Sequence, residues 1–123
     1  MEEYDYKKFV LYLYLIAAYA NYEVEEEEYD LIKTKLDSSQ LVPAEAFEKI
    51  YKEVKSDFEQ HNDYESIRHV QATQQHLNIK KEEMHKLYDD LKEIVMADHV
   101  VEESERIELF RLRKIMGLPG DEN

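Results

Sequence analysis

Acidic side chains with the spacing of a ligand set occur in a short pattern that the chain contains twice. Residues 20–28 and 97–105 each begin with Ala followed by Asn or Asp, and each carries Val four positions after the Ala and Glu five and eight positions after it. Both copies end an apolar run and begin a second helical pattern, so each predicts a turn between two helices. The side chains that could act as oxygen ligands are Asn21, Glu25 and Glu28 in the first copy and Asp98, Glu102 and Glu105 in the second. Ca²⁺ and Mg²⁺ prefer such oxygen ligands and Zn²⁺ accepts carboxylates, so a divalent metal site is one prediction.

The same glutamates also suit a structural role that needs no ligand. Glu102 and Glu105 have the spacing of a capping box, in which side chains at the first turn of a helix bond to free backbone amides. A carboxylate at that end also interacts favourably with the helix dipole, by about 0.3–1 kcal/mol. Asp98 differs, because it follows the end of the preceding helix, where a negative charge is unfavourable and a bound cation would compensate it. Helix caps and cation ligands are therefore two open interpretations of these acids.

The elements that position these acids are predicted to be helices throughout. Residues 9–20 form an unbroken apolar run, which is hydrophobic on every side and predicts a central, buried helix. The run is shorter than the roughly 20 residues that cross a bilayer, so no direct membrane insertion is expected. From the duplication we expect residues 9–20 to pack against residues 84–97, with the two turns related by an approximate two-fold axis. With only 2 Gly and 2 Pro, the chain is predicted to be all-α. We expect one compact domain over residues 1–123, built as a bundle of about six helices with a duplicated helix-turn-helix motif. Residues 117–123 are expected to form a C-terminal tail.

Local signals predict several helix ends. Pro43 is expected at the first position of a helix, and residues 61–63 are expected to end that helix. The Gln-rich segment that follows predicts a short or irregular helix, after which Asn78 should cap the next one. Gly117 should end the last helix in a left-handed conformation. The apolar stripe of that last helix comprises Ile107, Leu109, Phe110, Leu112, Ile115 and Met116.

Composition argues against several functions. The net charge of −13 disfavours nucleic acid and anionic membrane surfaces as partners but leaves cations and basic proteins. The chain has no cysteine, so disulfides, zinc–thiolate sites and thiol redox chemistry are excluded. Only one Glu-x-x-His pattern occurs, ending at His85, whereas a di-iron bundle needs two, so the residues favour a non-enzymatic role. Acids offset the lysines that precede the apolar run, so a secretion signal is not expected and the predicted location is cytoplasmic.

Histidine and tyrosine are the remaining side chains with polar chemistry. His61, His69 and His76 lack the spacing of a zinc site and are expected at the surface or partly buried. The 10 tyrosines either form a binding surface or border the core with their hydroxyls in solvent, and we favour the second interpretation.

The second copy of the pattern, together with Ile107 and Leu109 after it, resembles the Ala-Asp-Gly-x-hydrophobic-Asp-x-x-Glu signature of TerB-like domains. That family includes the tellurite-resistance protein TerB and the N-terminal domain of DjlA-type membrane co-chaperones. The resemblance covers nearly the whole chain, because the signature occurs once in each half of those all-α domains. The chain departs from the signature at Asn21, which replaces Asp, and at Tyr22 and His99, which replace Gly.

The resemblance implies a non-enzymatic binding or adaptor module with a protein partner in a stress-related setting of the tellurite-resistance type. In TerB-like domains the signature acids are associated with metal binding. Carried over residue by residue, this implies Asp98, Glu102 and Glu105 as ligands, with Asn21, Glu25 and Glu28 at the first turn. Two alternatives stay open: a metal-dependent enzyme that uses the same acids, and a metal-free protein-interaction domain.

Overall fold

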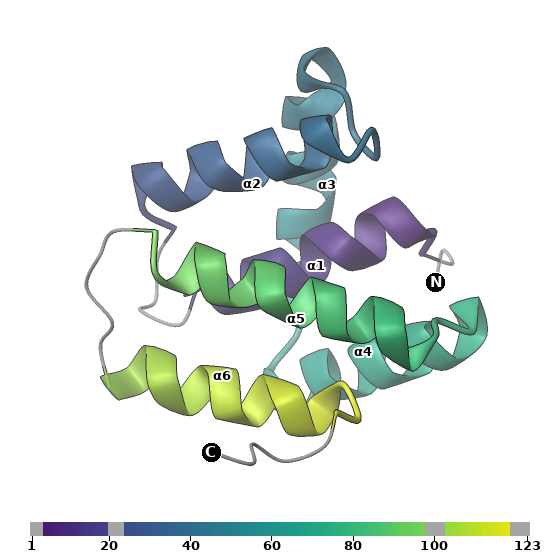
Figure 1. Cartoon of the computed structure of the whole chain (residues 1–123). Helices are drawn as coiled ribbons and strands as arrows, with labels where there is room; N and C mark the ends of the chain where they lie inside the picture. The colour runs from purple at the N-terminus through teal and green to yellow at the C-terminus, as the bar shows by residue number, and fades with distance from the viewer. Residues whose placement is uncertain (1–3, 20–23, 98–102, 119–123) are drawn as a thin grey trace.

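Six helices and no strand make up the part of the chain that the computed structural model describes, residues 4–19, 24–97 and 103–118 (Figure 1). The helices are α1 Tyr6–Ala18, α2 Glu26–Ser38, α3 Ala44–Gln60, α4 Asp63–Leu77, α5 Lys81–Val95 and α6 Glu103–Ile115. The predicted all-α class and number of helices are confirmed. The two copies of the duplicated pattern fall at the α1–α2 and α5–α6 junctions. None of the described helices is both long enough and apolar enough to cross a membrane.

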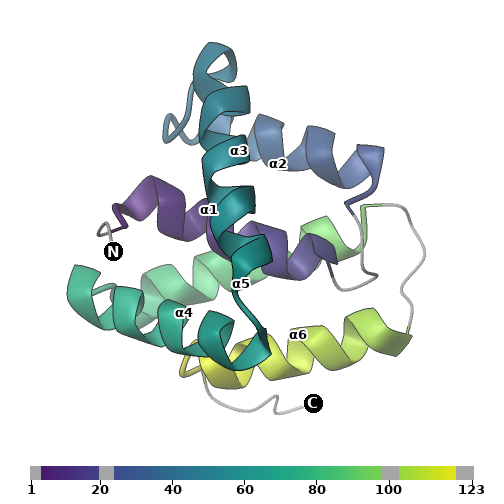
Figure 2. The ribbon, with the colours of Figure 1, turned by 180° about the vertical axis from the view of Figure 1, so that it is seen from behind.

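Helix α1 lies at the centre and contacts each of the other five described helices. Its side chains from Phe9 to Ala18 are all buried, because the run has no polar face to turn toward solvent. The most extensive contact of α1 is with α5, which confirms the predicted packing of the two segments that precede the acidic turns. Figure 1 shows α5 crossing in front of α1, and Figure 2 shows α3 crossing it on the opposite side. The two-fold relation between the turns stays a prediction.

Helix ends follow local chemistry, with three differences from the predictions. Pro43 precedes α3 as its N-cap residue and does not occupy the first helical position. Helix α4 is regular over 15 residues, not short or irregular, because Asn62 and Glu65 form a capping box at its start. Asn78 ends α4 in the left-handed region, at φ 53°, instead of capping α5, since Asn tolerates that conformation. Gly117 has φ 75°, which confirms the predicted end of the last helix.

Helix α6 buries only part of its apolar stripe. Leu112 and Met116 are buried, whereas Ile107 is 59% exposed and Phe110 is 54% exposed. The stripe is wider than the surface that α6 turns toward α1, α4 and α5. Two large apolar side chains of α6 are therefore left more than half exposed.

Candidate functional site

Of the ligand candidates in the duplicated pattern, the structure describes the side chains of Glu25 and Glu28, both in the first copy. Glu25 and Glu28 form a capping box at the start of α2, in which the backbone N–H of Glu25 donates to Oε1 of Glu28 at 2.9 Å. The Glu28 side chain is only 2% exposed. The ligand-free interpretation therefore accounts for these two glutamates. Asn21, Asp98 and Glu102 lie outside the described residues, as does the side chain of Glu105 in α6.

Within the described part of the chain, no group of three or more His, Asp and Glu side chains is arranged to hold a metal ion. Divalent metal binding by Asp98 and the glutamates stays a prediction.

If Asp98 binds Ca²⁺, Mg²⁺ or Zn²⁺, a hundredfold excess of the ion over its Kd should stabilise the fold by about 2.7 kcal/mol and raise Tm. Asp98→Asn should abolish that increase in thermal scans with and without a chelator. If Tm does not change and calorimetric titration shows no saturable heat, the metal-binding prediction is wrong and the metal-free alternative stands.

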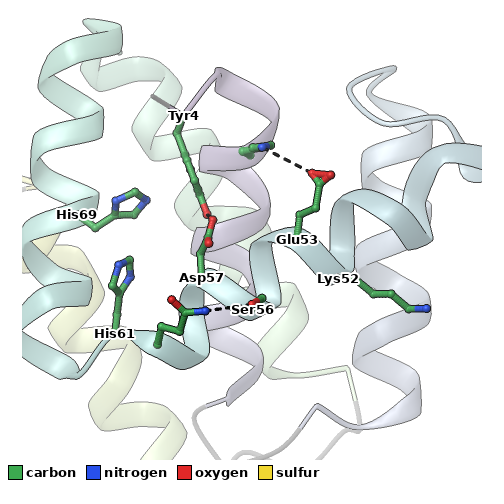
Figure 3. Close-up of a pocket in the computed structure, with 9 residues that line it drawn as sticks. Tyr4, Lys52, Glu53, Ser56, Asp57, His61 and His69 are labelled. Carbon is green, nitrogen blue, oxygen red and sulfur yellow. Dashed lines mark hydrogen bonds and ion pairs between the residues drawn. The ribbon is translucent and has the colours of Figure 1, made fainter. Parts of the chain in front are cut away.

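A polar cavity that the sequence did not predict lies between α1, α3, α4 and the segment before α1. Its volume is about 840 Å³. We call it the histidine cavity, and its lining residues are Tyr4, Lys8, Lys52, Glu53, Ser56, Asp57, Gln60, His61 and His69. Figure 3 shows the two imidazoles side by side, with the Tyr4 side chain extending to Asp57 next to them and Lys52 pointing away. The cavity thus holds two neighbouring titratable rings.

Tyr4 links the segment before α1 to α3 and α4. Its hydroxyl donates to Oδ2 of Asp57 at 2.7 Å, and its ring contacts the His69 ring edge-on, with centroids 4.5 Å apart. Nε2 of His69 is buried and has no hydrogen-bond partner among the described residues. Burial lowers the pKa of His69, and the neighbouring His61 lowers it further, against the opposing effect of Asp57. His69 is therefore neutral at pH 7, because a charged ring would bury an unpaired N–H.

Tyr12 connects the histidine cavity to the interior of the bundle. Its hydroxyl lies 2.8 Å from Nδ1 of His61 and 2.9 Å from Oγ of Ser66. The centroids of the His61 and His69 rings are 5.3 Å apart. Burial raises the pKa of Tyr12 to about 12, so the hydroxyl keeps its proton in neutral solution. Because a hydroxyl can donate to one neighbour and accept from the other, the direction of this hydrogen-bond chain can reverse without losing a bond.

The prediction that tyrosine hydroxyls reach solvent is wrong for Tyr4, Tyr12 and Tyr14. Tyr14 is buried and donates to Oδ2 of Asp90 at 2.9 Å, while Lys35 donates to the other oxygen of that carboxylate at 3.0 Å. Burial raises the pKa of Tyr14, and the charge of Asp90 raises it further. These three hydroxyls tie α1 and the segment before it to α3, α4 and α5.

A second hollow, here named the α6 groove, lies between α6 and parts of α1, α3 and α4. Its volume is about 570 Å³. The lining residues are Ile16, Tyr19, Phe58, Glu59, His61, Asp63, Ser66, Ile107, Glu108 and Arg111. His61 lines both the groove and the histidine cavity, so it forms part of the wall between them.

The charged side chains of the α6 groove are predominantly acidic. Arg111 donates to both carboxylate oxygens of Glu108, from Nη2 at 2.7 Å and from Nε at 3.2 Å, so these two charges offset each other. Glu59 and Asp63 then leave the groove with net negative charge. The other lining side chains include four large apolar ones, Ile16, Tyr19, Phe58 and Ile107. The groove therefore combines an apolar surface with a negative potential.

Comparisons with protein-family models, with curated proteins and with solved structures found no match to this chain. The resemblance to TerB-like domains stays a prediction that depends on the duplicated pattern alone.

Proposed function

We propose that this chain is a non-enzymatic protein-binding module that takes up a helical segment of its partner in the α6 groove. The segment would turn an apolar face into the groove and carry lysine or arginine at the edges of that face. The observation that carries the proposal is the combination of apolar and acidic side chains along one groove beside the exposed side of α6. Amphipathic helices commonly bind in such grooves.

The exposed apolar side chains of α6 supply the attraction. Ile107 and Phe110 are three positions apart, so they lie on one side of the helix, and both are more than half exposed. Large apolar side chains exposed together beside a groove are typical of interaction sites. Covering each of them completely would contribute about 1.5–3 kcal/mol. A groove of about 570 Å³ is also large enough to receive several side chains.

Charge selects a basic partner over an acidic one. The chain has a net charge of −13, and the groove itself is negative because Arg111 is already paired with Glu108. Each exposed ion pair with the partner would add at most about 1 kcal/mol. The long-range field would mainly raise the association rate and repel acidic segments. Protein binding without catalysis is also what the TerB-like resemblance implies, and the stress-related setting stays a prediction of that resemblance.

A synthetic helical peptide of about 14 residues, with leucines along one face and lysines along the other, tests the proposal. We expect saturable binding with a Kd of about 1–100 μM, measured by fluorescence anisotropy, and weaker binding as the salt concentration rises. Amide chemical shifts should change around the α6 groove. The same peptide with glutamate in place of each lysine should bind at least about tenfold more weakly.

Matched variants locate the binding site. Ile107→Ser removes apolar area from the groove and should weaken binding of the lysine peptide about tenfold. Tyr64→Ser is the control, because Tyr64 is 65% exposed and does not line the groove, so its loss should leave Kd unchanged. Equal binding of the two peptides, or a Kd that Ile107→Ser does not change, would contradict the proposal.

A further inference from the structure

We propose that a second copy of this chain packs against the exposed side of α6, so that the two α6 helices lie antiparallel across a two-fold axis. The observation behind it is the order of four exposed side chains along that helix: Glu103, Ile107, Phe110 and Lys114. We call these four residues the α6 stripe. The inference goes beyond the proposed function, because it concerns a copy of the chain itself and requires no other partner.

The α6 stripe is continuous along one side of the helix. Its members follow each other at intervals of four, three and four positions, which is the seven-residue repeat that brings side chains of one helix against a second helix. Helix α6 runs without a break from Glu103 to Ile115, so the stripe extends over about 16 Å. Figures 1 and 2 both show α6 at an edge of the bundle. A second helix can therefore contact the stripe along its whole length.

The stripe is complementary to itself when it is turned end to end. A two-fold axis midway between Ile107 and Phe110 places Ile107 opposite Phe110 of the second copy, and Glu103 opposite Lys114 of the second copy. The reverse pairs form at the same time, because a two-fold interface uses the same residues on both sides. Apolar side chains then meet at the centre of the interface and opposite charges meet at both ends. A parallel arrangement would instead place Glu103 against Glu103 and Lys114 against Lys114.

The charged ends of the stripe are available for this pairing. Neither Glu103 nor Lys114 forms an ion pair with another described residue. Nζ of Lys114 lies 4.6 Å from the centroid of the Phe110 ring, so the side chain extends along the stripe toward its apolar centre. The structure thus places both the apolar and the basic part of the stripe on one surface.

Several features limit the strength of the dimer. Each copy has a net charge of −13, so two copies repel each other at long range. Arg106 and Arg113 lie beside the stripe on the same side and would approach each other across the axis. Two short helices also make a small interface, and small interfaces are typical of transient complexes. We therefore expect a Kd of about 10–100 μM for the dimer.

Ile107 belongs both to the α6 stripe and to the lining of the α6 groove. A second copy that covers Ile107 prevents a partner helix from using the same side chain. Dimerisation would thus compete with partner binding, and this consequence alone rests on the proposed function.

Sedimentation velocity of the full chain at about 1–300 μM, without any peptide, tests the inference. The average mass of the wild-type protein should rise toward that of a dimer across this range. Glu103→Lys and Lys114→Glu each place like charges at both ends of the interface, so each should weaken association at least about tenfold. An equimolar mixture of the two variants should associate again, because every end then joins a lysine to a glutamate. This recovery also shows that both variants are folded.

Lys49→Glu is the matched control, because it makes the same change of charge as Lys114→Glu on a different surface. Lys49 is exposed on α3 and lines neither the histidine cavity nor the α6 groove. Its Kd for dimerisation should stay within about twofold of the wild-type value. A wild-type chain that stays monomeric up to about 300 μM, a mixture of the two α6 variants that does not associate, or an equal loss in Lys49→Glu would overturn the inference. Since no peptide is present, these results are independent of whether the proposed function holds.

Discussion

Phe9→Ala should destabilise the protein by about 3–5 kcal/mol, a large part of the roughly 5–15 kcal/mol by which a domain of this kind is stable. Phe9 is completely buried in α1, the helix that every other described helix contacts. Removing the ring leaves a cavity among packed helices, which relax only partly into the space. Urea unfolding followed by circular dichroism should show a lower midpoint with an unchanged slope.

Phe110→Ala is the matched control, because it removes the same group from a side chain that is 54% exposed. The loss there is mainly a contact with Lys114, whose Nζ lies 4.6 Å from the ring centroid. We expect this variant to cost less than about 1 kcal/mol. Similar costs for the two substitutions would contradict the central position of α1.

Raising the pH above about 10 should unfold the protein cooperatively. Tyr4, Tyr12, Tyr14 and Tyr51 are buried, and burial raises the pKa of all four, that of Tyr12 to about 12. A group with a raised pKa stays protonated in the folded state at a pH where the unfolded chain has lost the proton. Its stabilising contribution is complete below the unfolded pKa of about 10 and is lost as the pH rises toward the folded value, by about 1.4 kcal/mol per pH unit. Four such groups would remove about 5 kcal/mol within the first unit.

Ultraviolet absorbance of tyrosinate and far-ultraviolet circular dichroism, recorded on the same samples, measure this transition. Of the 10 tyrosines, some should ionise at the ordinary pH and the rest should ionise together with the loss of helical signal. Tyr14→Phe removes one of the late groups, so the alkaline transition should become less steep by about one proton. Ionisation of all tyrosines near pH 10 with the helices intact would show that their hydroxyls are open to solvent.

Features that depend on neighbouring residues were predictable from the sequence. The apolar run of α1 has no polar side, so it can only be buried, and the structure places it at the centre. Glu25 and Glu28 act on amides within one helical turn, so their spacing alone predicts the capping box. Gly117 ends α6 through its own backbone freedom. In each case the energetic reason lies within a few residues of the chain.

The candidate sites depend on packing between distant segments, and there the sequence was insufficient. His61 and His69 are eight residues apart, as Tyr4 and Tyr12 are, but nothing in the sequence shows that the two pairs meet. The Tyr12–His61 contact joins residues 49 positions apart and exists only because α1 lies against α3 and α4.

For Ile107 and Phe110, periodicity predicted an apolar stripe, but the angle at which α6 meets its neighbours decides which part of that stripe is covered. The sequence by itself thus determined the all-α class, the capping box of α2, the end of α6 and the central position of α1, because those follow from local hydrogen bonding and hydrophobicity. Only the tertiary structure decided the histidine cavity and the α6 groove, because burial and exposure at both depend on how separate helices pack.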